Sequence, residues 1–217
     1  MSVSNEFTGP AITNAGSAPA DIELVVDGRR RTARVTGADV LMTVLRDQLG
    51  CGSVREGCGV GACGACTVLV DGRSVSSCLA LAVRHHGAEV TTTEGLPDDD
   101  PVVRAYVAER AMQCGYCIPG FVLMTHELLA DNPDPSEAEI AEQLEGNLCR
   151  CGAYVEIKAA AARAARDGAR AGAPHAAAAD ASAADVPAAD AGATATATAT
   201  ATRNQDPATA RNEEVTG

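Results

Sequence analysis

Eight of the nine cysteines in this 217-residue chain fall into two groups of four, and the two groups have different spacings. The first group, C-x4-C-x2-C-x11-C, consists of Cys58, Cys63, Cys66 and Cys78. The second group, C-x2-C-x31-C-x-C, consists of Cys114, Cys117, Cys149 and Cys151. We name them the first and the second quartet. Because thiolates are ligands for zinc and for iron–sulfur clusters, the sequence predicts a metal centre on each quartet.

The first quartet begins with C-x4-C-x2-C, which is the plant-type [2Fe–2S] pattern when a fourth cysteine follows. A cluster needs a tightly curled loop with small residues where the backbone passes close to sulfur. The loop supplies Gly57, Gly59, Gly61, Ala62, Gly64 and Ala65. Zinc is the alternative, but zinc sites commonly use two C-x2-C pairs and this loop holds only one. We therefore predict a plant-type cluster.

Residues 59–64 also match the dinucleotide-binding pattern G-x-G-x-x-G. That pattern binds a dinucleotide only between a strand and a helix. Here a loop precedes it and a β-type run at residues 67–70 follows, so we reject this match.

The second quartet is less diagnostic when it is considered alone. Its C-x-C end disfavours an ordinary zinc knuckle, and a redox-active C-x2-C is usually found near a βαβ pattern. A second cluster is favoured, while zinc and a redox disulfide remain open on spacing alone. His85 and His86 suggest a Rieske site, but both quartets are already complete in cysteine. Cys51, the remaining cysteine, is expected to be a small buried apolar residue, and His126 is expected on a helix surface.

The residues around the first quartet predict a small α+β domain over residues 21–96. Alternating polarity predicts strands at residues 22–26, 29–35, 67–70, 73–76 and 89–93. Two Asp-Gly pairs, Asp27-Gly28 and Asp71-Gly72, predict hairpin turns. Asp39 is expected to cap a helix over residues 40–48.

The residues around the second quartet predict a helical domain over residues 97–166. Helical periodicity is found at residues 102–112, 120–130, 137–144 and 155–166. Pro119 stands just before the second of these helices, and Ser136 is a good N-cap for the third. Residues 1–20 are expected to be a flexible arm, and residues 167–217, rich in Ala and Thr, a disordered tail.

The net charge of −12 argues against a nucleic-acid partner, because phosphates would be repelled. No run of about 18 apolar residues is present, so no membrane span is expected. The first 20 residues contain no Lys or Arg and no apolar core of a signal peptide. We therefore expect a cytoplasmic protein with reduced thiols.

Three segments together resemble the small iron–sulfur subunit of the molybdenum hydroxylases, the family of xanthine dehydrogenase, aldehyde oxidoreductase and carbon monoxide dehydrogenase. They are residues 56–68 (EGCGVGACGACTV), 112–117 (MQCGYC) and 146–151 (GNLCRC). The resemblance extends over about residues 21–165. It implies a β-grasp ferredoxin domain followed by a four-helix domain, each with one [2Fe–2S] cluster on its quartet.

The resemblance also implies the function and the partners. In this family a molybdenum–pterin cofactor in a large subunit oxidises substrate, and electrons leave through the helical-domain cluster, then the plant-type cluster, then FAD on a medium subunit. The complex implied is a dimer of heterotrimers, and this chain does no substrate chemistry. Gln113 and Cys151 match positions that contact the pterin.

The resemblance is incomplete at Gly152-Ala153-Tyr154, where many relatives have Thr-Gly-Tyr. This difference leaves the ligands intact and concerns only contacts near the pterin. For Gln113 a capping or packing role is the alternative. For the whole chain, the alternatives are a freely diffusing ferredoxin and a zinc-stabilised structural module.

Overall fold

The computed structural model describes residues 18–171. The expected flexible arm and disordered tail fall mainly on residues outside this range. Within it, residues 20–95 form a sheet and its connections, which we name the sheet module, and residues 101–171 form the helical module.

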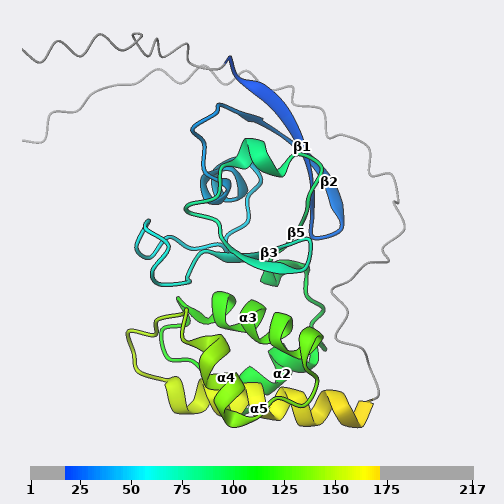
Figure 1. Cartoon of the computed structure of the whole chain (residues 1–217), viewed down its shortest axis with the longest axis vertical. Coiled ribbons are helices and arrows are strands. Elements are labelled where there is room, and N and C mark those ends of the chain that lie inside the picture. The colour runs from blue at the N-terminus through cyan, green and yellow to red at the C-terminus, as the bar shows by residue number, and fades with distance from the viewer. Residues whose placement is uncertain (1–17, 172–217) are drawn as a thin grey trace, which may run out of the picture. The chain divides into compact units, whose positions relative to one another are not determined.

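The sheet module contains a five-stranded mixed sheet with the strand order β2-β1-β5-β3-β4 (Figure 1). The strands are β1 (Ala20–Val26), β2 (Arg29–Val35), β3 (Thr67–Val70), β4 (Arg73–Ser76) and β5 (Glu89–Thr91). β1 pairs antiparallel with β2 and parallel with β5, and β3 pairs antiparallel with β4 and β5. The expected hairpins are confirmed. The last strand is shorter than expected, because residues 93–95 form the 3-10 helix η3 (Thr93–Gly95).

Both hairpins turn through left-handed backbone at their Asp-Gly pairs. The φ angles are 51° at Asp27 and 74° at Gly28, and 50° at Asp71 and 80° at Gly72. Positive φ at both central residues is the signature of a type I′ turn, whose twist matches that of the flanking strands. This is why the two Asp-Gly pairs located the hairpins correctly.

The helix expected at residues 40–48 is present but differs in two respects. α1 (Leu41–Thr43) continues as a π-helical segment, η1 (Val44–Gln48). Asp39 does not cap it, so that prediction is wrong: Val40 holds the N-cap position without a side-chain bond. The Asp39 carboxylate instead accepts a 2.6 Å hydrogen bond from the Thr36 amide, which closes the turn before the helix. A second short helix, η2 (Ala82–His85), precedes β5.

The helical module consists, among the described residues, of α2 (Pro101–Ala108), α3 (Ile118–Asp131), α4 (Glu137–Leu144) and α5 (Tyr154–Ala171). The α4 bounds agree with the expected ones, and Ser136 forms the capping box with Glu139. α2 ends earlier than expected because Arg110 adopts a φ of 52°. Pro119 lies in the first turn of α3 rather than before it.

Each module has its own apolar core, and α3 packs between the two. Its neighbours are β3 and β4 on one side and α2, α4 and α5 on the other (Figure 1). In the helical core Phe121 and Tyr106 are almost completely buried, and in the sheet core so are Leu24 and Leu45. The two modules therefore share an extended packed contact.

The expectation that His126 lies on a helix surface is wrong. His126 is buried in α3, and its Nε2 lies 3.0 Å from Oδ1 of Asp100. The same carboxylate oxygen accepts hydrogen bonds from the amides of Val102 and Val103 and thereby caps α2. The polar ring is accommodated in the interior because a buried carboxylate pairs with it.

Candidate metal centres

The first quartet lies on the loop between η1 and β3 and on the turn that follows β4. The structure brings its thiols together in pairs. The Cys63 thiol donates a hydrogen bond to the Cys58 sulfur, and the Cys78 thiol donates one to Cys66. Cys66 and Cys78 are buried, whereas Cys58 is exposed. One pair thus lies near the surface and the other lies against the sheet core.

Backbone amides of this loop point at the cysteine sulfurs. The amides of Val60 and Ala62 donate to Sγ of Cys58 over 3.4 and 3.3 Å. These bonds stabilise the thiolate and lower the pKa of Cys58 to about 7. Amides also reach Cys63 and Cys78, from Ala65 and Gly61 respectively. Such a loop suits thiolate ligands, and sulfur hydrogen bonds are a main control of cluster potential.

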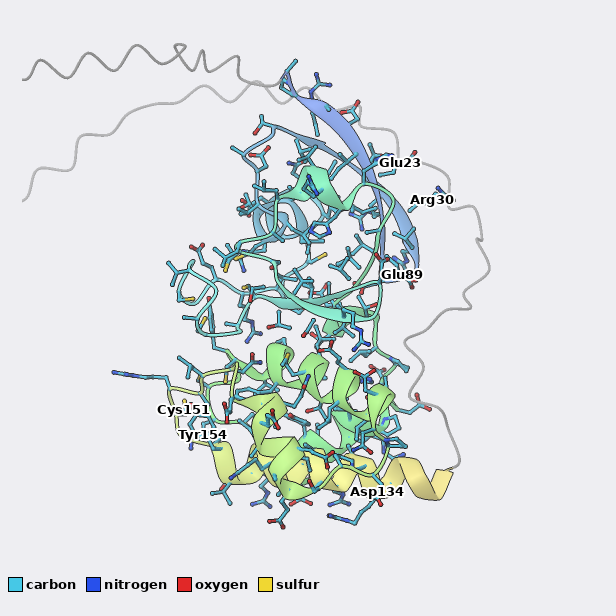
Figure 2. All side chains as sticks on the ribbon, in the orientation of Figure 1. Glu23, Arg30, Glu89, Asp134, Cys151 and Tyr154 are labelled. Carbon is cyan, nitrogen blue, oxygen red and sulfur yellow. The ribbon has the colours of Figure 1, made fainter. Side chains whose placement is uncertain are left out.

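The second quartet is assembled from two loops of the helical module, one before α3 and one before α5. The Cys151 thiol donates to Cys114, and the Cys117 thiol donates to Cys149. The Tyr116 amide bonds the Cys114 sulfur and is the main cause of the lowered pKa of that thiol. The Cys149 amide donates to the hydroxyl of Tyr154 over 2.9 Å. Figure 2 shows Cys151, on the loop that leads into α5, close to Tyr154 at the start of that helix.

The arrangement of both quartets suits a [2Fe–2S] cluster. All nine cysteines are free of disulfide bonds. Within residues 18–171, no three His, Cys, Asp or Glu side chains gather around one point as ligands of a single ion. The thiols lie two and two, as a cluster with two irons and four cysteine ligands requires. The close approach of the loop backbone to the first quartet requires glycine at position 57, since a Cβ there would lie 2.7 Å from Sγ of Cys63.

The two quartets approach each other where the modules meet. The Leu148 amide, directly before Cys149, donates a 2.9 Å hydrogen bond to the carbonyl of Cys63. Next to this bond, a Cβ at Gly64 would collide with the Asn147 side chain, and a Cβ at Gly120 would collide with the Gly64 carbonyl. Both positions therefore require glycine, and the loop of one module touches the backbone of the other.

Two residues of this boundary were not among the sequence-based candidates. Asn147 is 3% exposed, and its Nδ2 has no hydrogen-bond partner among the described residues. Arg55 crosses the boundary and donates to the carbonyl of Gly115 over 2.6 Å. Arg55 offered no signal in the sequence, because its partner is 60 positions away.

The remaining candidates are placed as follows. Gln113 is exposed, and its Nε2 donates to the Cys151 carbonyl over 3.4 Å. Cys51 is buried in the sheet core, and burial is the main cause that raises its pKa to about 11. His86 accepts a hydrogen bond from the Glu23 amide at Nδ1 and so contacts β1. Gln113 thus lies beside the second quartet.

Comparison with known proteins identifies both modules. Residues 24–91 match the 2Fe-2S iron-sulfur cluster binding domain, and residues 92–162 match the [2Fe-2S] binding domain. The nicotine 6-hydroxylase small subunit of Paenarthrobacter nicotinovorans is 42% identical over 67% of this chain and 89% of its own length. The isoquinoline 1-oxidoreductase subunit alpha of Brevundimonas diminuta is 41% identical over 68% of this chain and 99% of its own length.

The chain belongs to the small iron–sulfur subunits of the molybdenum hydroxylases. Among solved structures, a chain of quinoline 2-oxidoreductase from Pseudomonas putida 86 superposes with a TM-score of 0.67 and 36% identity, over 72% of this chain and 99% of that one. A second match, the aldehyde oxidoreductase from Desulfovibrio desulfuricans, has a TM-score of 0.65 and 38% identity. Here 70% of this chain corresponds to 17% of the longer one.

As a member of this family, the small subunit is an electron-transfer component of an oxidoreductase and binds iron–sulfur clusters. Its mixed sheet and helices fit a β-grasp domain joined to a helical domain. Of the helices within residues 18–171, none combines the length and the apolar character needed to cross a membrane.

Proposed function

We propose that this small subunit carries electrons through two [2Fe–2S] clusters, from a molybdenum–pterin centre on a large subunit to FAD on a medium subunit. The observation that supports this most directly is the 2.9 Å hydrogen bond from the Leu148 amide, directly before Cys149, to the carbonyl of Cys63, which joins the backbone of the two quartets. Bound [2Fe–2S] clusters accept and release single electrons. The chain's own part is to hold its eight ligands, keep the two sites adjacent and exclude water between them.

The proposed ligands of the plant-type cluster are Cys58, Cys63, Cys66 and Cys78. Those of the helical-module cluster are Cys114, Cys117, Cys149 and Cys151. The pairing of thiols and the amides that point at them support both assignments. Asn147 and the neighbouring glycines support a fixed separation, since they leave no room for the modules to slide.

The second quartet is proposed to face the large subunit. Its surroundings expose apolar side chains that a protein partner would cover: Met112, Tyr116, Leu148, Tyr154 and Val155. Gln113 and Cys151 are proposed to contact the pterin, which their mutual hydrogen bond at this surface supports. Val60 and Leu79, both exposed beside the first quartet, are proposed to lie at the contact with the medium subunit.

We propose the domain limits 21–96 for the plant-type domain and 97–166 for a four-helix [2Fe–2S] domain, with a flexible arm over 1–20. The disordered tail, expected to begin at residue 167, is proposed to begin after α5, because that helix continues to Ala171. A dimer of heterotrimers and a cytoplasmic location complete the proposal.

The experiment is isolation of the native complex, with analysis of molybdenum, pterin, flavin and iron, followed by low-temperature EPR after reduction. Two distinct [2Fe–2S] signals are expected. Cys114→Ser should remove one signal and stop turnover while leaving the plant-type signal. Cys51→Ala is the matched control, because Cys51 is outside both quartets, and it should retain both signals. Turnover that survives in Cys114→Ser would contradict the relay, and a complex without molybdenum or pterin would indicate a diffusible carrier.

A further inference from the structure

Arg55 belongs to the sheet module but its side chain lies against the second quartet. Its own amide is held in the sheet module by a 3.2 Å hydrogen bond to the Ala65 carbonyl. Its Nη1 donates over 2.6 Å to the carbonyl of Gly115, which directly follows Cys114. The guanidinium carbon lies 5.3 Å from the centre of the Tyr116 ring, a cation–π distance. Two independent contacts therefore fix this cation on the Cys114–Cys117 turn.

A second contact runs from the helical module back to the sheet module. The Tyr116 hydroxyl donates over 2.7 Å to the carbonyl of Glu56, the residue after Arg55. Each module thus gives one side chain to the backbone of the other. The guanidinium therefore lies against a ring whose hydroxyl is bonded to the next residue of the same module.

The charge of Arg55 is not neutralised within the part of the chain that the structure describes. Arg55 takes part in no ion pair there, although its side chain is half-buried. Arg150, between two other cysteines of the quartet, is exposed, so solvent screens its charge more strongly.

We propose that Arg55 sets the reduction potential of the cluster on the second quartet. The physical reason is that reduction adds one negative charge to the cluster. A fixed, half-buried cation beside the cluster therefore stabilises the reduced form more than the oxidised form. Arginine is suited to this role because it stays charged at any working pH and stacks on an aromatic face. A residue of one module thereby raises the electron affinity of the site in the other. This inference rests on the proposed function, which supplies the second cluster.

The experiment is an EPR-monitored redox titration of the complete complex, with both clusters followed separately. Arg55→Gln should lower the potential of the second cluster. We expect about a tenfold smaller ratio of reduced to oxidised cluster at a fixed potential, which corresponds to about 59 mV for one electron. Arg55→Lys, which keeps the charge, should restore most of this difference. The first cluster should shift less than the second.

Arg46→Gln is the matched control. Arg46 also belongs to the sheet module and donates to a backbone carbonyl, that of Val54 at 2.7 Å, so the variant removes the same charge and the same kind of bond. It should leave the second cluster unchanged. An unchanged potential in Arg55→Gln, or an equal fall in Arg55→Lys, would overturn the proposal.

Iron and acid-labile sulfide are measured in each variant. Should Arg55→Gln lose iron, Arg55→Met takes its place, and loss of the second signal in both would assign Arg55 to assembly of the site and overturn the proposal. A wild-type complex with only one [2Fe–2S] signal would instead contradict the proposed function itself, which keeps the two failures apart.

Discussion

The backbone amide of Leu148 donates a hydrogen bond to the carbonyl of Cys63 over 2.9 Å, and these residues belong to different modules. Leu148 directly precedes Cys149, so this hydrogen bond joins the chain beside one quartet to the chain beside the other. The Leu148 side chain is 54% exposed, and packing of that side chain is not what holds the contact. This contact is made by backbone atoms, whereas Arg55 and Tyr116 cross the same boundary through their side chains.

The first prediction concerns exchange of this amide with solvent. An amide on a surface loop normally exchanges fast, but that of Leu148 opens only if the modules separate. We expect it to be protected like amides of α3 in hydrogen–deuterium exchange read by fragmentation mass spectrometry. The amide of Gly146, an exposed residue of the same loop, serves as the comparison. Equally fast exchange at Gly146 and Leu148 would contradict a stable contact between the modules.

The second prediction is that replacing Gly120 by alanine destabilises the protein, opposite to the usual effect of this substitution in a helix. Alanine is favoured over glycine inside a helix by about 1 kcal/mol. Gly120→Ala should nevertheless destabilise the protein, by about 1–3 kcal/mol, because the new Cβ meets the Gly64 carbonyl. Urea unfolding measures the change. Ala130→Gly, at an exposed position of α3, calibrates the helix preference, and a stabilised Gly120→Ala variant would show that the modules can move apart.

The third prediction follows from the buried pair of Asp100 and His126. Burial raises the pKa of Asp100. Hydrogen bonds from His126 and from the amides of Val103 and Val102, together with the charge of His126, lower it by more, so the net pKa lies below 3.8. Such a carboxyl stabilises the fold fully above the unfolded pKa, and the contribution is lost as the pH falls through the folded value.

The corresponding measurement is the free energy of unfolding between neutral and strongly acidic pH. Asp100→Asn keeps an oxygen that can cap α2 but loses the charge that faces His126, so it should cost about 1.5–3 kcal/mol near pH 7 and should flatten the acid limb. Asp99→Asn removes the same charge from an exposed neighbour and should keep the wild-type acid limb. Identical pH profiles for wild type and Asp100→Asn would refute the assignment.

The fourth prediction distinguishes two carboxylates that both reach Arg73 from α3. The Glu127 side chain is 11% exposed and also accepts from the Ser74 amide and from Gln143. Glu127→Ala should cost about 1–3 kcal/mol, because those donors lose their partner. The Asp131 side chain is 56% exposed and, within the described residues, pairs only with Arg73, so Asp131→Ala should cost about 0–1 kcal/mol. Thermal unfolding of both variants measures the difference, and equal losses would count against it.

Local features of the fold could be predicted from the sequence. The two Asp-Gly turns adopt the left-handed backbone that only a few residues tolerate, and Ser136 with Glu139 forms a capping box, so short patterns were sufficient there. Asp39 illustrates the limit. It has the right residue type for a cap, but a turn donor three residues earlier competes for its carboxylate, and spacing alone does not decide between the two.

The contacts across the module boundary could not be predicted in this way. The sequence alone does not show that His126 has a buried partner, because that partner, Asp100, lies 26 positions away at the start of another helix. Arg55 and Asn147 likewise contact residues that are distant in the sequence, so these contacts depend on how the modules pack. The cysteine spacings identified candidate ligands, whereas the surroundings that adjust them became visible only in three dimensions.

Gly64 and Gly120 meet backbone to backbone, and Asn147 fills the remaining space. Halves of this subunit therefore cannot be exchanged freely with those of relatives in protein engineering. A donor half with even a methyl group at either glycine would hold its companion away and, in the proposed relay, widen the gap between the two clusters. A working chimera has to inherit these three residues as one set.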